Sequence, residues 1–212
     1  MAKTKKTKRR HGSIMGRSDI PFAQRMAMQH HSDIVVNREH AAKIAMFCMS
    51  VAMHELEGIG YKRLVRFTSK FMENIRGFYE DPDVGMDRAR RRLEQHGIRI
   101  SGEFFVAPRQ EGQSQREWEI DNHRLQSSQA ALLCGTVTMN DVFGFGQGRM
   151  ERITTRGREL SARYAKEGEQ FLLDKMAEIG FPVVNGKVLA YMDDDGNAIM
   201  PSRARKEGYP DA

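Results

Sequence analysis

Apolar residues recur every three or four positions over two long stretches in the first half of the chain. That period corresponds to one face of an α-helix, and it predicts helices over 37–56 and 61–79. A short Met-rich segment at 20–29 precedes them, and a charged helix is expected over 84–96. The segment IRISGEFFV at 98–106 is rich in β-branched and aromatic residues around a Ser-Gly pair, which predicts a strand pair.

The same order of elements returns in the second half. The pattern predicts a helix that ends at Val142, another that runs to about Tyr164, and a third from about Glu167 to a stop at Gly180. The run FPVVNGKVLAYM that follows contains Asn185-Gly186, which is a strong signal for a two-residue hairpin turn. Each half therefore predicts a helix, a Gly-x-Gly turn, two further helices and a β-hairpin.

The two halves also agree residue by residue at a constant offset of 86. The shared positions are apolar residues at core spacing, the glycines of the turns and two arginines one helical turn apart. They are Cys48 and Cys134, Val51 and Val137, Met53 and Met139, Gly58 and Gly144, Gly60 and Gly146, Arg63 and Arg149, and Arg66 and Arg152. We therefore expect an α+β, mostly α-helical fold built by tandem duplication of one helix–Gly-x-Gly–helix–helix–hairpin unit.

Composition divides the chain into five segments. Residues 1–18 are expected to form a disordered basic arm, 19–107 the first repeat unit and 108–122 a polar, Gln-rich linker. The second repeat unit is expected over 123–195, followed by a C-terminal tail over 196–212. A length of 212 residues suits two small units in contact, and whether they share one core stays open.

The chain is 40% hydrophobic and 29% charged, which is typical of a folded soluble protein. No apolar run approaches the roughly 20 residues needed to span a bilayer, and the basic start lacks the apolar stretch of a secretory signal. Cys48 and Cys134 both lie in apolar helical patterns, so we expect two buried thiols rather than a disulfide. These features predict a cytoplasmic location.

The net charge of +6 is unevenly distributed. Seven of the 34 Lys and Arg residues precede the first acid, Asp19, which leaves 27 cations against 28 acids in the rest. The arm therefore carries the positive charge, and such arms bind polyanions without reading sequence. The arm residues expected to contact nucleic acid are Lys3, Lys5, Lys6, Lys8, Arg9 and Arg10.

The turn LEGIGYKRLVRF is the first candidate site in the body of the protein. Its glycines would let a helix begin with exposed backbone N–H groups beside Lys62 and Arg63, an arrangement that can hold a phosphate. Over about a dozen residues it resembles the helix-hairpin-helix motif of proteins that bind DNA backbones, although Gly148 replaces Lys62 in the second half. The alternative is a tight corner in which Ile59 and Phe145 fill a core.

Two arginine pairs follow the turns, and each pair lies on one helix face because its members stand three residues apart. The pairs are Arg63 with Arg66, and Arg149 with Arg152. They are candidates for contacts with phosphates or with an acidic partner surface. Alternatively, they pair with Glu55 and Asp141, two acids that precede the turns at equivalent positions and would pin each corner.

A third basic cluster, Arg90, Arg91 and Arg92, lies in the predicted helix 84–96 beside the first strand pair. A helix followed by a hairpin is similar to a winged-helix layout, in which the helix enters a DNA groove. The other interpretation is a solvated charged face, because the second half has no such cluster.

Motifs for catalysis and metal binding are incomplete in this chain. His54-Glu55 lacks the second histidine of a zinc helix, and Cys48 has no basic residue to activate it. The acids at 193–195 precede a glycine at a hairpin tip and lack the ligand spacing of an EF-hand. We therefore expect no enzyme activity, no metal site and no cofactor.

The run NREHAAKIAMFCMSVAMHELEGIGYKRLVRF resembles a group of small proteins encoded by phages and prophages of Gram-positive bacteria. Their shared core is a helix, Gly-aromatic-Gly and an Arg-Leu-x-Arg-Phe helix. GIGYKRLVRF fits it with Ile59 in the aromatic position, and GFGQGRMERI fits it except at Met150 and Ile153. The resemblance implies a mobile-element origin and a bacterial host rather than an activity.

Two classes of function remain after these exclusions. The first is a phage-encoded protein that binds nucleic acid, double-stranded DNA foremost, through the arm and the basic residues named above. The second is a counter-defence protein of the anti-CRISPR type that inhibits a host nuclease or signalling protein. A virion or assembly component and an oligomeric state also stay open.

Overall fold

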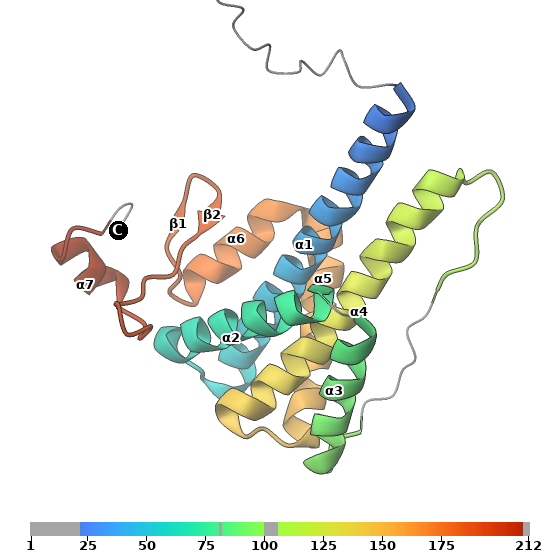
Figure 1. The fold of residues 1–212 in the computed structure, drawn as a ribbon. Helices are drawn as coiled ribbons and strands as arrows, with labels where there is room; N and C mark the ends of the chain where they lie inside the picture. The colour runs from blue at the N-terminus through green and yellow to red at the C-terminus, as the bar shows by residue number, and fades with distance from the viewer. Residues whose placement is uncertain (1–21, 81, 100–105, 210–212) are drawn as a thin grey trace, which may run out of the picture.

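The computed structural model describes residues 22–80, 82–99 and 106–209. Within these ranges the chain forms seven helices and one two-stranded antiparallel sheet (Figure 1), so the prediction of a mostly helical fold is confirmed. The elements are α1 (Phe22–Glu57), α2 (Tyr61–Glu80), α3 (Pro82–Gln95), α4 (Gln115–Phe143), α5 (Gln147–Glu167), α6 (Glu169–Glu178), β1 (Val183–Val184), β2 (Lys187–Val188) and α7 (Pro201–Lys206). No helix of the described part is long and apolar enough to cross a membrane.

Two of the expected boundaries were wrong. α1 is one helix of 36 residues rather than a short segment at 20–29 and a separate helix at 37–56, because no glycine or proline interrupts it. α4 begins at Gln115, inside the expected linker 108–122. The Ser114 hydroxyl accepts from the Glu117 amide, and the Glu117 carboxylate accepts from the Ser114 amide, which forms a capping box.

The turns behave as the sequence predicts where the structure describes them. Asn185 and Gly186 both have positive φ, and their hairpin pairs β1 with β2. Gly97 follows the end of α3 and Gly180 follows the end of α6, and the same hydrogen bond closes both helices. The Ile98 amide donates to the Leu93 carbonyl, and the Phe181 amide donates to the Met176 carbonyl. The arm at 1–18 and the first hairpin turn, which falls on 100–105, lie outside the described residues.

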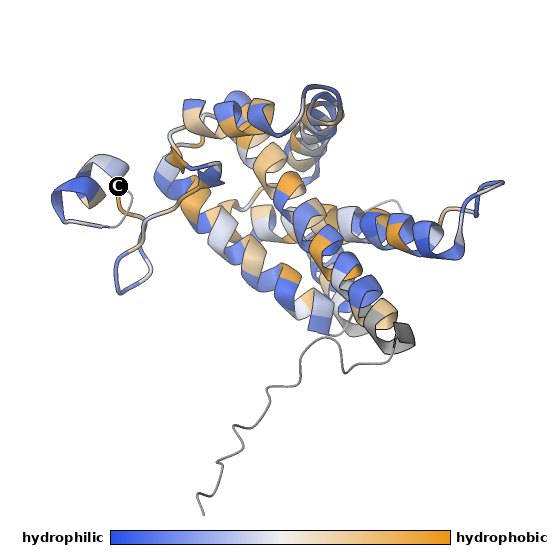
Figure 2. Cartoon of the chain, turned by 90° about the horizontal axis from the view of Figure 1, so that it is seen from above, coloured by the Kyte–Doolittle hydropathy of each residue, from blue (hydrophilic) through white to orange (hydrophobic). Residues whose placement is uncertain are grey.

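The two halves of the chain interlock around one core. α1 packs mainly on α4 and α5, while α2 packs mainly on α4, so each helix before a Gly-x-Gly turn lies against helices from the other half. Figure 2 shows the hydrophobic positions gathered where these helices meet. One apolar cluster runs through α1 to α6, which answers whether the halves have one core or two.

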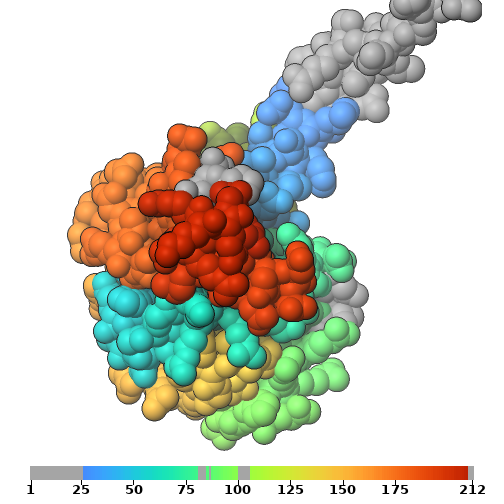
Figure 3. All heavy atoms as spheres, turned by 90° about the vertical axis from the view of Figure 1, so that its left-hand side faces the viewer, coloured from blue at the N-terminus to red at the C-terminus, as the bar shows by residue number. Residues whose placement is uncertain are grey.

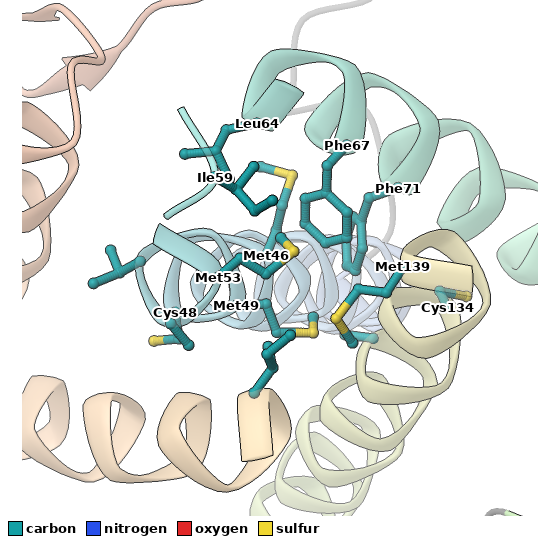
Figure 4. Close-up of a cluster of buried hydrophobic side chains, with 14 of the residues drawn as sticks. Met46, Cys48, Met49, Met53, Ile59, Leu64, Phe67, Phe71, Cys134 and Met139 are labelled. Carbon is teal, nitrogen blue, oxygen red and sulfur yellow. The ribbon is translucent and has the colours of Figure 1, made fainter. Parts of the chain in front are cut away.

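The tightest glycine contact in this core is between Gly135 of α4 and Met49 of α1. A Cβ atom on Gly135 would lie 2.4 Å from both Sδ and Cε of Met49. Gly157 of α5 offers the same side chain a second small surface, because a Cβ there would lie 3.7 Å from Met49 Cγ. The thioether therefore fills the space where α1, α4 and α5 meet, at the centre of the cluster in Figure 4.

The two cysteines are free and buried, as expected. They lie on different helices at separate edges of the cluster (Figure 4). Burial raises the pKa of each thiol to about 12, so both stay protonated and unreactive at neutral pH.

The C-terminal segment forms a small second cluster of Tyr191, Ile199 and Ala204. It docks on the first half of the chain: the Tyr191 amide donates to the Tyr61 hydroxyl over 3.2 Å. In Figure 3 this segment, coloured red, lies across the face between α6 and α2. The described part of this segment is therefore anchored on α2 at Tyr61 and at Ser69, whose hydroxyl donates to the Met192 sulfur, instead of forming a free tail.

Polar contacts hold the N-terminal half of α1 against α4. His30 Nε2 lies 2.7 Å from Glu119 Oε2, and Arg116 binds Asp33. Beside them, burial and the Arg38 guanidinium lower the pKa of His123. The buried Nδ1 atoms of His30 and His123 have no hydrogen-bond partner among the described residues.

We expect Gly135→Leu to lower the free energy of unfolding by about 1–3 kcal/mol in urea denaturation, because the new side chain overlaps Met49. Gly77→Leu is the matched control: Gly77 is exposed on α2 and a Cβ added there would meet no atom within 4 Å, so helix propensity stabilises the variant by several tenths of a kcal/mol. Adding Met49→Ala to Gly135→Leu restores part of the loss. Equal effects of the two leucines would contradict the close contact.

We expect stability to fall as the pH drops below the 6.5 of an ordinary histidine. The pKa of His123 is lowered in the folded chain, so the unfolded chain protonates this residue near 6.5 while the folded chain resists protonation until lower pH. The unfolded state then binds more protons and is favoured by acid. Urea denaturation between about pH 7.5 and pH 5.5 should therefore show a smaller loss for His123→Gln than for the parent. The exposed His31→Gln is the control, and it should retain the parent's pH dependence.

Candidate anion-binding site

The two Gly-x-Gly turns have the same geometry. Gly58 and Gly144 both have φ of 65°, and each donates its amide to the carbonyl four residues earlier. The central residues Ile59 and Phe145 are buried, with 5% and 4% of their surface exposed. The prediction that these side chains fill the core is therefore confirmed.

A side chain from the preceding helix closes each turn. His54 Nδ1 donates to the Ile59 carbonyl over 3.0 Å, and Asn140 Nδ2 donates to the Phe145 carbonyl over 3.1 Å. His54 and Asn140 are themselves separated by the offset of 86. Matching identical residues between the halves misses this pair, because the shared property is an N–H donor rather than a residue type.

The two turns border one groove of about 500 Å³. We call it the arginine groove; its lining is Glu57, Ile59, Arg63, Arg66, Val142, Phe143, Phe145 and Arg149. The surface of the groove is mainly polar. The structure thus brings together arginines that are far apart in sequence, at the N-terminal ends of α2 and α5.

Glu57 holds the arginines of α5. Its carboxylate lies 2.8 Å from Arg152 Nη2 and 3.7 Å from Arg149 Nε. The guanidinium of Arg149 also lies over the Phe145 ring, 5.4 Å from its centroid. These two arginines are therefore already partly neutralised.

The expected acid partners were wrong. Glu55 binds Arg156 at 2.7 Å, and Asp141 binds Arg92 of α3 at 2.9 Å. α1 lies against α5 rather than along α2, so its last acids reach arginines of the other half.

Arg63 and Arg66 differ from the α5 pair. Within the described residues no carboxylate lies within ion-pair distance of either side chain. Both are exposed and line the groove, and Lys62 is exposed beside them in the first turn of α2. The α2 side of the groove therefore carries uncompensated positive charge.

The helix N-termini at the groove also lack acids. α4 starts with a capping box and Glu117 in its first turn, whereas the first turns of α2 and α5 contain no acid. Cations at a helix N-terminus oppose the helix dipole, at a cost of about 0.3–1 kcal/mol each. An anion bound at the groove would remove that penalty.

The arginines of α3 lie on a separate surface. Arg91 and Arg92 border a hollow of about 550 Å³ together with Arg88, Asp87 and Gln95. Arg91 lies 3.9 Å from Asp87, and Arg90 is half-buried with further contacts of its own. The hairpin that would complete a winged-helix layout falls on 100–105, outside the described residues.

The arm residues Lys3, Lys5, Lys6, Lys8, Arg9 and Arg10 lie outside the described part as well. The described chain begins at Phe22, the first residue of α1, whereas Glu57 at the other end of this 36-residue helix lines the groove. At 1.5 Å per residue, the two ends of α1 are roughly 50 Å apart.

Among the described residues no three His, Cys, Asp or Glu side chains are grouped so that they could hold a metal ion. The chain matches no protein-family model, no curated protein and no solved structure. The arginine groove itself is therefore the basis for inferring what the protein does.

We expect Asn140→Leu to lower the free energy of unfolding by about 1–2 kcal/mol, because the carbonyl of Phe145, a residue of the core, loses its side-chain donor. His54→Leu should have a similar effect at the other turn. Gln170→Leu is the control, since it removes only an exposed bond to Asp174 within α6. Thermal and urea denaturation measure all three, and an Asn140 variant as stable as the Gln170 variant would contradict the role of the donor.

Proposed function

We propose that this protein binds nucleic acid without catalysis and holds the phosphate backbone at the arginine groove, with the basic arm adding contacts. The single observation that carries the proposal is the uncompensated charge of Arg63 and Arg66. They face a groove at two helix N-termini and have no carboxylate partner within the described residues. Guanidinium groups and helix N-termini are both well suited to bind phosphate.

The lining of the groove favours phosphate over the nucleobase as the group that enters it. Phe145 is buried, and Phe143 packs on Phe67 and Phe145 with ring centroids 6.4 Å and 5.1 Å away, so both rings are already engaged with other aromatic residues. Contacts of this kind position a protein on a duplex without reading its sequence. Double-stranded DNA is the first ligand to test.

We also propose that the two halves arose by tandem duplication. Exchanging the halves converts the packing of α1 on α5 into the packing of α4 on α2, and both are main contacts of the core. The donors His54 and Asn140 and the glycines with matching φ correspond under the same exchange. A mobile-element origin remains part of this proposal, carried by the resemblance of the Gly-x-Gly core.

The absence of catalysis is likewise a proposal, and the buried thiols support it. Cys48 and Cys134 are kept protonated by burial, which raises the pKa of each to about 12 and removes the thiolate that would act as a nucleophile. Binding alone can account for the arginine groove.

We expect Arg63→Ala with Arg66→Ala in the full-length chain to weaken binding to a labelled duplex of about 20 base pairs by at least tenfold at low salt. The slope of log K against log salt should become less steep by about one to two, since each lost phosphate contact contributes about 0.9. Fluorescence anisotropy across a salt series measures both quantities.

Arg158→Ala with Arg205→Ala is the matched control, because it removes two exposed charges at positions outside the groove lining. Replacing the six arm cations by glutamine separates the contribution of the arm. If the arm variant abolishes binding and the Arg63 and Arg66 variant behaves like the control, the groove is not the site. If the parent binds neither DNA nor RNA at low salt, the counter-defence alternative, in which the groove contacts an acidic host protein, takes precedence.

A further inference from the structure

Glu57 makes the arginine groove asymmetric. Its carboxylate contacts Arg149 and Arg152 on one side, and its side chain is only 13% exposed. The residue at the equivalent position of the second half, 86 residues later, is Phe143. The position that places a negative charge beside the α5 arginines therefore holds an aromatic residue in the other half, and both residues line the groove.

A carboxylate that binds two arginines imitates what a phosphate would do there. It accepts from Arg152 at hydrogen-bond distance and attracts Arg149, which are the contacts a ligand oxygen would otherwise make. A phosphate approaching this side would meet a half-neutralised arginine pair and a like charge that is shielded from water. Repulsion between like charges at such a site is strong and costs affinity.

We propose that Glu57 limits the number of phosphate groups that the groove accepts. It occupies the place of a second phosphate on the α5 side and so limits the groove to one phosphate group, held by Arg63 and Arg66. This inference rests on the proposed function, because it takes the groove to be a phosphate site. It goes further in assigning opposite roles to two arginine pairs that are equivalent in sequence.

The packing of the core does not require a carboxylate on both sides of the groove. Phe143 fills its position by packing on Phe67 and Phe145, so the α2 side needs no carboxylate for its structure. Glu57, at the last position of α1, reaches α5 because α1 and α5 lie against each other.

The test is Glu57→Gln in the full-length chain, which keeps the shape of the side chain and removes its charge. We expect binding to the same labelled duplex to strengthen by roughly tenfold at low salt. The slope of log K against log salt should become steeper by about one to two, because Arg149 and Arg152 now contact phosphate. Adding Arg149→Ala and Arg152→Ala to Glu57→Gln should return both quantities to the parent values.

Glu55→Gln is the matched control, with the same change in charge two residues away. Its partner Arg156 does not line the groove, so its binding should stay close to that of the parent. Thermal denaturation checks that both variants are folded. Equal affinity and equal salt slope for the two glutamine variants would overturn the inference.

The outcomes separate this inference from the proposed function. If the parent binds and Arg63→Ala with Arg66→Ala loses binding while Glu57→Gln changes nothing, the groove is a phosphate site and Glu57 has no selective role. If the parent binds weakly and only Glu57→Gln binds well, the inference is supported. If neither binds DNA or RNA at low salt, both proposals fail.

Discussion

The contact between Met49 and Gly135 determines how the rest of the molecule is arranged. Because Gly135 has no side chain, α1 and α4 approach closely enough for one flexible thioether to fill the space between three helices. A symmetric core would place two methionines or two glycines at these equivalent positions, giving either a clash or a void. One large and one small residue avoid both, and the two halves become complementary rather than identical.

The same division between shared and differing positions extends to the groove. The glycines, the buried Ile59 and Phe145 and the donors that close the turns give both corners one geometry. Glu57 and Phe143 then make the two sides electrostatically different. Because the two turns share one backbone geometry, exchanging a single side chain changes the charge of the groove while its position stays the same.

Much of the fold follows from local signals in the sequence, and most of the site does not. Helical periodicity, the Asn-Gly turn and the glycine stops predicted the elements, since each depends on neighbouring residues. The packing of α1 on α5 and of α3 on α4 depends on contacts far apart in the chain, so the partners of Glu55 and Asp141 were predicted wrongly. The start of α4 was readable in Ser114 and Glu117, a capping pattern that the composition of the segment obscured.

The uninterrupted length of α1 also sets how long a ligand must be to reach both ends of this helix. The described chain begins at Phe22, while the groove lies at Glu57 at the opposite end of 36 helical residues. The roughly 50 Å between them corresponds to about 15 base pairs of a duplex at about 3.4 Å per step. For the proposed complex, a shorter duplex cannot lie against both ends of α1, so the smallest duplex that does so is set by the length of one helix rather than by charge.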